Sequence, residues 1–219
     1  MLFLSWTDGA STMKPTDFLR RLSESTSLGP SPTFSELHLA KALETIYERG
    51  RVGRAALSRA IGLGEGATRT LLGHLKREGL VETSKLGSEL TEAGLELHRR
   101  LYSKVRSRRE FPPSSITVGE RNFVFHVGGV GHLVTSGVRQ RDQAVRAGAE
   151  GAVVIVCRDG HLLMPPDSTP MRVRWPEISE SITEELSPVE GDVLIISGAD
   201  TLEDAEMGAR AAALTLVDC

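Results

Sequence analysis

The sequence predicts an α+β protein built from two modules. Three observations support this: apolar residues recur at helical spacing over residues 34–105, a charged segment ending in Pro-Pro-Ser-Ser covers residues 106–115, and β-branched runs with glycine turns begin near Ile116. A chain of 219 residues is long enough for two modest hydrophobic cores. We therefore divide the chain into an N-terminal arm, a helical domain and an α+β domain, at residues 1–33, 34–110 and 111–219.

Charge is distributed unevenly between the two modules, although the net charge is only −3. Residues 34–110 contain 15 Lys and Arg against 10 Asp and Glu, whereas residues 111–219 contain 8 against 16. A basic module joined to an acidic one indicates two modules with different partners. An excess of basic residues is typical of proteins that bind nucleic acid.

The cysteine and hydropathy patterns predict a cytoplasmic protein. Cys157 lies in an apolar run and Cys219 is the last residue, which fits neither a disulfide framework nor a zinc site, so a reducing compartment is the simplest interpretation. The apolar start, Met1 to Trp6, is too short for a signal peptide and lacks its basic region. No run approaches the roughly 18 apolar residues of a membrane span, so we expect no membrane association.

Helices and one hairpin are expected in the basic module. Helical spacing with glycine stops predicts three helices, over residues 35–48, 54–61 and 65–78. Residues 80–91 follow as strand, turn and strand with Lys85 at the tip, and a fourth helix has the apolar stripe Leu97, Leu101 and Val105. This order is that of a winged helix-turn-helix, in which the third helix enters the major groove of DNA.

The third predicted helix has two chemically different sides. One side is mostly apolar and consists of Thr68, Leu71, Leu72 and Leu75. The opposite side carries glycine, hydroxyl, imidazole and guanidinium groups, which can contact phosphates or base edges. Glycine inside a helix costs about 1 kcal/mol relative to alanine. Close packing against a neighbouring helix and close approach to a duplex both explain Gly66 and Gly73, and their outward position favours the duplex.

The predicted function is that of a transcriptional regulator that binds double-stranded DNA. The candidate DNA-binding residues are Arg54, Gly66, Arg69, Thr70, Gly73, His74, Arg77 and Lys85. A homodimer is expected because such regulators commonly read two half-sites. The alternative is a winged helix that binds protein or RNA without sequence-specific DNA binding, because a fold does not determine a function. A third helix whose outer side is buried against the C-terminal module would favour this alternative.

Beyond residue 115 the pattern predicts strands and helices in the order β-β-α-β-β-α-β-α. Strands are expected over residues 121–127, 132–135, 152–157, 161–164 and 193–197. Helices are expected over residues 139–147, from Pro176 and from Leu202. Asp159-Gly160 is typical of a hairpin turn. This order predicts a two-layer α+β sandwich.

The acidic module has no recognisable metal or catalytic motif. Residues 128–131 are glycine-rich but do not form a dinucleotide-binding fingerprint, and the spacing of His126, His132 and His161 fits no metal-ligand pair. No Ser/His/Asp or Cys/His arrangement stands out. We therefore expect no cofactor, no metal and no enzymatic activity; a deep pocket with a convergent acid, base and nucleophile would be needed for an enzyme.

One charged pair, Arg141 and Asp142, opens a helix after a tight turn. A salt bridge within the domain is the simpler explanation. The alternative is an anchor for an anionic ligand or a partner, so both are candidate ligand-binding residues. The domain is then expected to sense a small-molecule effector or to mediate dimerisation.

Several stretches resemble those of a known family. In the basic module they are residues 29–43 (GPSPTFSELHLAKAL) and 64–70 (GEGATRT), and in the acidic module residues 137–145 (GVRQRDQAV) and 148–152 (GAEGA). They are similar to an archaeal family of winged-helix proteins with a C-terminal domain of unknown function. The resemblance covers nearly the whole chain after residue 28. It implies a transcriptional regulator and transfers no established site.

Overall fold

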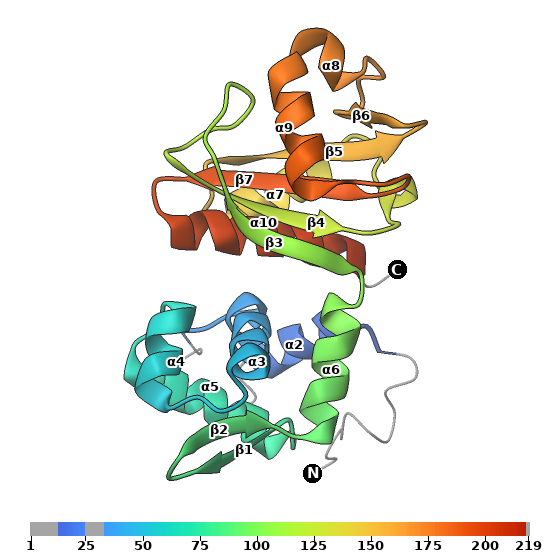
Figure 1. Ribbon diagram of the computed structural model, residues 1–219. Helices are drawn as coiled ribbons and strands as arrows, with labels where there is room; N and C mark the ends of the chain where they lie inside the picture. The colour runs from blue at the N-terminus through green and yellow to red at the C-terminus, as the bar shows by residue number, and fades with distance from the viewer. Residues whose placement is uncertain (1–12, 25–32, 218–219) are drawn as a thin grey trace. The chain divides into compact units, whose positions relative to one another are not determined.

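The computed structural model describes residues 13–24 and 33–217, which divide into two compact units between Tyr102 and Ser103 (Figure 1). The expectation for Met1 to Trp6 lies outside the described residues. The chain combines helices and sheets, which confirms the predicted α+β class. Within the described residues no helix is both long and apolar enough to span a membrane.

The N-terminal unit is helical with one hairpin. Its helices are α2 (Pro15–Ser23), α3 (Glu36–Arg49), α4 (Arg54–Ile61), α5 (Glu65–Arg77) and α6 (Glu92–Tyr102), and its strands are β1 (Val81–Ser84) and β2 (Gly87–Leu90). The three helices predicted from periodicity are confirmed to within one residue at each end. Gly50 and Gly62 follow α3 and α4 with φ of 72° and 70°, a backbone conformation that glycine adopts without steric cost.

Fully buried leucine and isoleucine side chains form the core of this unit. They include Leu39, Leu43 and Ile46 of α3, Leu57 and Ile61 of α4, and Leu71 and Leu75 of α5. Helix α2 packs against α3 and α6, and its Leu19 is also fully buried. Residues 13–24 therefore belong to this unit, rather than to the separate arm that we expected.

The fourth helix is shorter than predicted. Helix α6 ends at Tyr102, and Val105 begins strand β3 (Val105–Phe111) instead of continuing the helical stripe. Strand β3 pairs antiparallel with β4 (Arg121–Val127), so most of the segment interpreted as a linker is an edge strand. An edge strand tolerates charged side chains, and the charges of β3 hid its strand character. The boundary between the units accordingly lies eight residues before the predicted one.

A five-stranded sheet in the order β3-β4-β7-β5-β6 forms the centre of the C-terminal unit. Its remaining strands are β5 (Gly151–Arg158), β6 (His161–Leu163) and β7 (Val193–Ala199), and its helices are α7 (Val138–Arg146), α8 (Met171–Arg174), α9 (Pro176–Leu186) and α10 (Leu202–Val217). All its strand pairs are antiparallel. The strand predicted over residues 132–135 is wrong, because a 3-10 turn at Gly131–Leu133 occupies this position.

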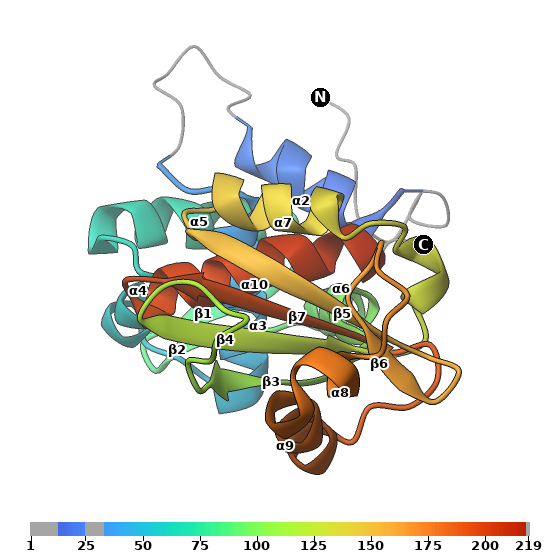
Figure 2. The ribbon, with the colours of Figure 1, turned by 90° about the horizontal axis from the view of Figure 1, so that it is seen from above.

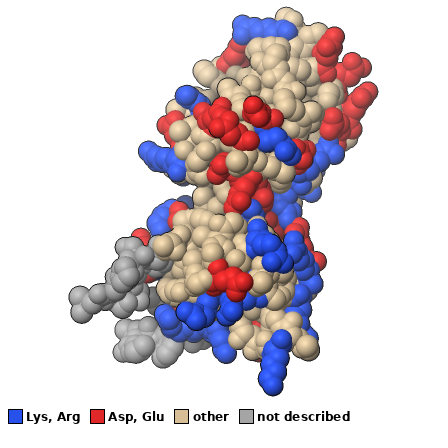
Figure 3. All heavy atoms as spheres, turned by 90° about the vertical axis from the view of Figure 1, so that its left-hand side faces the viewer, with Lys and Arg blue, Asp and Glu red and all other residues tan. Residues whose placement is uncertain are grey.

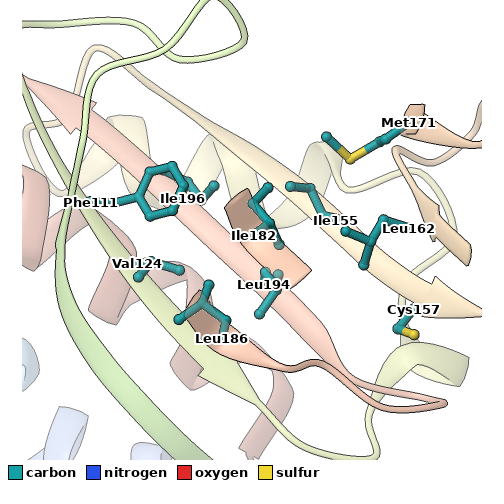
Figure 4. Close-up of a cluster of buried hydrophobic side chains, with 10 residues drawn as sticks. All are labelled: Phe111, Val124, Ile155, Cys157, Leu162, Met171, Ile182, Leu186, Leu194 and Ile196. Atoms are coloured by element: carbon teal, nitrogen blue, oxygen red, sulfur yellow. The ribbon is translucent and has the colours of Figure 1, made fainter. Parts of the chain in front are cut away.

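Helices cover both faces of the sheet, which corrects the predicted two-layer sandwich (Figure 1 and Figure 2). Helices α7 and α10 pack on one face. On the other face, Ile182 and Leu186 of α9 join a cluster with alternate residues of the strands, among them Val124, Leu194 and Ile196 (Figure 4). All seven residues of β7 are buried, as expected for a strand covered on both faces.

One buried carboxylate, that of Asp192, joins the start of β7 to the end of β4. Its Oδ2 lies 2.7 Å from His126 Nε2 and accepts the Val189 N–H at 3.0 Å. Its Oδ1 accepts the Gly129 N–H at 3.1 Å and lies 3.1 Å from the Arg106 guanidinium. Burial alone would raise the pKa of Asp192. The hydrogen bonds from Val189, His126 and Gly129 outweigh burial and hold the pKa below its ordinary 3.8.

We expect Asp192→Asn to lower the free energy of unfolding by roughly 3 kcal/mol at pH 7, because an amide NH₂ cannot accept the bonds that one carboxylate oxygen accepts. Since folding lowers the pKa, the carboxylate stabilises the fold above the unfolded-state pKa and loses this contribution as the pH falls through the folded-state value. The difference between wild type and variant should therefore shrink below about pH 4, as measured by urea unfolding across pH.

The matched control is Asp159→Asn, which makes the same change at an exposed turn position. Asp159 has φ of 52°, and asparagine tolerates this conformation well, so the control should be nearly neutral. A neutral effect of Asp192→Asn at pH 7, or a difference that stays constant down to pH 3, would contradict the stabilising role of this carboxylate.

Candidate nucleic-acid interface

Hydrogen bonds and a left-handed glycine define the turn between α4 and α5. Gly62 ends α4, and its N–H donates to the Ser58 carbonyl. The Ser58 hydroxyl, in a buried residue, donates to the carbonyl of Leu63. Gly64 caps the start of α5, and its carbonyl accepts both the N–H and the hydroxyl of Thr68. The direction of α5 relative to α4 is thereby set by backbone contacts on both sides of the turn.

Helix α5 has the two sides that the sequence predicted. Thr68, Leu71, Leu72 and Leu75 are buried. The exposed residues of α5 are Glu65, Gly66, Arg69, Thr70, Gly73, Lys76 and Arg77. Lys76 was not among the predicted site residues. It lies seven residues after Arg69, which is the spacing of two helical turns, and this spacing could have identified it.

The two glycines of the exposed side have no packing role among the described residues. A Cβ placed on Gly66 or Gly73 would meet none of their atoms within 4 Å. Gly94 of α6 is different, because its Cβ would lie 2.0 Å from the Leu80 carbonyl oxygen. Close packing therefore explains Gly94, which lies against the backbone just before β1, whereas close packing against a neighbouring helix is wrong for Gly66 and Gly73. What these two glycines provide is a low, open surface on α5.

Free positive charge lies beside this open surface. Arg69 and Arg77 are exposed and form no ion pair with any residue in the described ranges. The β1–β2 hairpin closes with Ser84 paired to Gly87, which leaves Lys85 and Leu86 as a two-residue tip. Lys and Arg side chains gather over the N-terminal unit on the side that Figure 3 shows.

The second strand of the hairpin is tied to the segment before α4. Val52 and Ser88 exchange two backbone hydrogen bonds of 2.9 Å each. The guanidinium of Arg51 forms an ion pair with Glu89 of β2 at 2.7 Å. Strand β2 is thus anchored close to the turn, because Ser88 pairs with Thr83 directly beside the closing Ser84–Gly87 pair, while Leu86 at the tip is 75% exposed.

Two other predicted site residues, Arg54 and Thr70, are exposed, but each already interacts with another group of the N-terminal unit. Arg54 lies 3.4 Å from the Glu65 carboxylate in the first turn of α5, so its charge is partly balanced. The Thr70 hydroxyl donates to the Gly66 carbonyl at 3.2 Å, and its lone pairs remain able to accept a hydrogen bond. Both side chains therefore can reach a ligand, with less free charge at Arg54 than at Arg69.

His74 differs from the other predicted site residues, because it faces the unit itself. Its Nδ1 lies 2.9 Å from the Leu22 carbonyl oxygen, and its ring meets the edge of Phe34 with centroids 5.4 Å apart. A carbonyl oxygen only accepts, so Nδ1 carries the proton in this contact. His74 connects α5 to α2, and we assign it a structural role.

The earlier boundary between the units changes the charge argument. Residues 104–109, with four basic side chains, belong to the C-terminal unit, and residues 34–102 keep eleven Lys and Arg against nine Asp and Glu. Arg106 and Arg109 of β3 are paired with Asp192 and Glu185. Net charge therefore supports nucleic-acid binding only weakly, and the exposed side of α5 becomes the principal observation.

The charged pair predicted in the C-terminal unit is exposed on α7. Arg141 and Asp142 form no ion pair with each other or with another described residue. Consecutive residues point about 100° apart on a helix, so they cannot face one another, and the predicted salt bridge within the domain is wrong. Arg141 lines a small hollow of about 130 Å³ together with Val118 and Gly151.

The three histidines considered as metal ligands have separate environments. His126 is buried against Asp192, whereas His132 is exposed on the 3-10 turn and His161 begins β6. Throughout residues 13–24 and 33–217, no three His, Cys, Asp or Glu side chains are arranged to hold a metal ion.

Comparisons with known proteins agree with part of the predicted resemblance. Residues 118–216 match a family described as a domain of unknown function, DUF4443. No curated protein matches the sequence. Among solved structures, the chain is similar to the hypothetical protein PH0730 from Pyrococcus horikoshii OT3, with a TM-score of 0.61 and 27% identity over 81% of this chain and 91% of that chain. The chain is therefore similar to an archaeal protein, and its C-terminal unit to a domain of unknown function.

Proposed function

We propose that the chain is a transcriptional regulator that binds double-stranded DNA through a winged helix-turn-helix. Its helix-turn-helix is α4 and α5, and its wing is the β1–β2 hairpin. The order of α3, α4, α5 and the hairpin is that of a winged helix-turn-helix, and Val52 forms a single antiparallel bridge to Ser88 of the wing.

The observation that carries the proposal is the open, positively charged side of α5. Gly66 and Gly73 lower the helix surface where no described residue packs against it. Arg69 and Arg77 border this surface without ion-pair partners among the described residues. At the two glycine positions no side chain keeps a DNA backbone or base edge away from the helix. Free guanidinium groups bind phosphate or guanine.

The position of each side chain suggests its role. In helix-turn-helix proteins the N-terminal residues of the recognition helix contact base edges, which assigns Arg69 and Thr70 to bases. Arg77 lies two turns further along and Lys85 at the wing tip, where contacts with phosphates are expected. Arg54 contributes less, because Glu65 already balances part of its charge.

The C-terminal unit would then control or pair the DNA-binding units. Reading two half-sites requires a dimer, and a small-molecule effector that binds this unit would modulate the regulator. Its small hollow beside Arg141 is a candidate place for such a ligand.

We expect Arg69→Ala/Arg77→Ala to weaken binding to the preferred duplex by at least roughly tenfold, because each arginine contact to a base or phosphate is lost. The salt dependence of binding should also become shallower, by about one unit of the log–log slope for each phosphate contact removed. Fluorescence anisotropy with labelled duplexes from the chain's own upstream region, across a salt series, measures both quantities.

The control is Arg172→Ala/Arg174→Ala in α8, which removes the same charge from exposed positions of the C-terminal unit and also breaks the ion pair of Arg174 with Asp167. It should leave affinity and salt slope close to wild type. Binding that is weak, indifferent to sequence and unchanged in Arg69→Ala/Arg77→Ala would contradict the proposal and favour a protein- or RNA-binding module.

We expect Gly66→Ala/Gly73→Ala to stabilise the fold while weakening DNA binding. Alanine is the better helix former by about 1 kcal/mol at each position, and its methyl group meets no described atom. The same methyl groups would obstruct a duplex that approaches the helix closely. Thermal unfolding and anisotropy of the same preparation test the two effects together.

Gly94→Ala is the opposing control, because its methyl group would collide with the Leu80 carbonyl and should lower the melting temperature. Unchanged DNA affinity in Gly66→Ala/Gly73→Ala would show that the open surface is not a contact surface for DNA.

A further inference from the structure

Helix α7 exposes a stripe with apolar ends and a charged centre. Val138 and Val145 are 50% and 44% exposed, and Arg141 and Asp142 lie between them. The spacing of three, one and three residues places all four on one side of the helix. Ala144 is on the buried side, where α7 packs against α10 and β5. The stripe therefore faces away from the unit's own core.

The apolar character extends beyond the helix. Of the large apolar side chains that the described C-terminal unit exposes, Val118 also belongs to this region, since it lines the hollow that Arg141 borders. Three exposed valines thus surround one unpaired arginine and one unpaired aspartate. Exposed apolar side chains that lie together are typical of protein-binding surfaces, and unpaired opposite charges beside them are available for ion pairs with a partner.

We propose that a second copy of this chain packs on this surface, with its α7 antiparallel to the first about a two-fold axis. Along the stripe the side chains are apolar, charged, charged and apolar, and the two charges on either side of the midpoint between residues 141 and 142 are opposite. An antiparallel two-fold arrangement therefore sets Val138 against Val145 of the second copy. It also sets Arg141 against Asp142 of the second copy, and this ion pair forms twice.

A second copy fits this surface better than an unrelated protein because the surface is complementary to itself. A two-fold interface requires the same patch to supply both halves of each contact, and the order of apolar, positive, negative and apolar side chains does so. Arg139 and Arg146 lie about 80–100° around the helix from Val138, at the margin, where salt screens their repulsion.

This inference adds a dimer surface to the proposed function, but it is argued from the C-terminal unit alone and does not depend on DNA binding. A nine-residue helix is only about 14 Å long, so its exposed stripe is small beside the roughly 800 Å² per partner of a standard interface. A dimer that dissociates in the micromolar range is therefore expected.

Sedimentation velocity of the full chain without DNA, over a concentration series, tests the surface. Arg141→Glu sets two acidic groups against each other, and Asp142→Arg sets two basic groups against each other. Each variant alone should dimerise at least roughly tenfold more weakly than wild type. An equimolar mixture should regain wild-type dimerisation, because each variant then supplies the charge that the other needs.

Arg139→Glu is the matched control, since it makes the same charge change on the same helix outside the stripe, and it should dimerise nearly as wild type. Far-ultraviolet circular dichroism verifies that every variant is folded. A wild-type chain that stays monomeric, single variants that dimerise as wild type, or a mixture that remains monomeric would each overturn the proposal. Because no DNA is present, failure of DNA recognition cannot imitate any of these results.

Discussion

The burial of one side of α5 is the constraint on which the candidate interface depends. Leu71 and Leu75 are fully buried in the N-terminal unit, and with 3.6 residues per turn the residues opposite them must face outward. The hydrogen bonds of the turn at Gly62 and Gly64 fix where this side begins. The exposed glycines and arginines are thus held in register by the same leucines that stabilise the unit.

The two units differ in whether their arginines are paired with carboxylates. On α5 the arginines remain unpaired among the described residues, whereas Arg106 and Arg109 of β3 are paired with carboxylates of the C-terminal unit. This pairing is most extensive at Asp192, where four donors surround one buried carboxylate. The basic side chains that appear equivalent in the sequence therefore have separate roles, two in folding and two available for a ligand.

Local patterns predicted much of the fold, and long-range contacts explain the failures. Periodicity and glycine stops located α3, α4 and α5, and Asp159-Gly160 forms the predicted turn with positive φ at both residues. Strand β3 was missed because an edge strand can be as charged as a linker. The layer formed by α9 was missed because residue order alone does not say which face a helix covers.

For the candidate site too, local patterns predicted one part, and contacts between residues distant in sequence determine the rest. The exposed side of α5 followed from the helical wheel, except that Lys76 was overlooked. The role of His74 could not be predicted, because its partner Leu22 lies 52 residues away in the sequence. The open space around Gly66 and Gly73 is also a tertiary property, and only the structure separates these glycines from the packed Gly94.

Selection of duplexes from a random library, followed by measurement of the dissociation constant for the enriched and a scrambled duplex at one salt concentration, tests the central claim most directly. A regulator that reads bases through α5 should bind the enriched duplex at least roughly 10³-fold more tightly than the scrambled one. Equal dissociation constants for the two duplexes would contradict sequence-specific recognition of DNA by this chain.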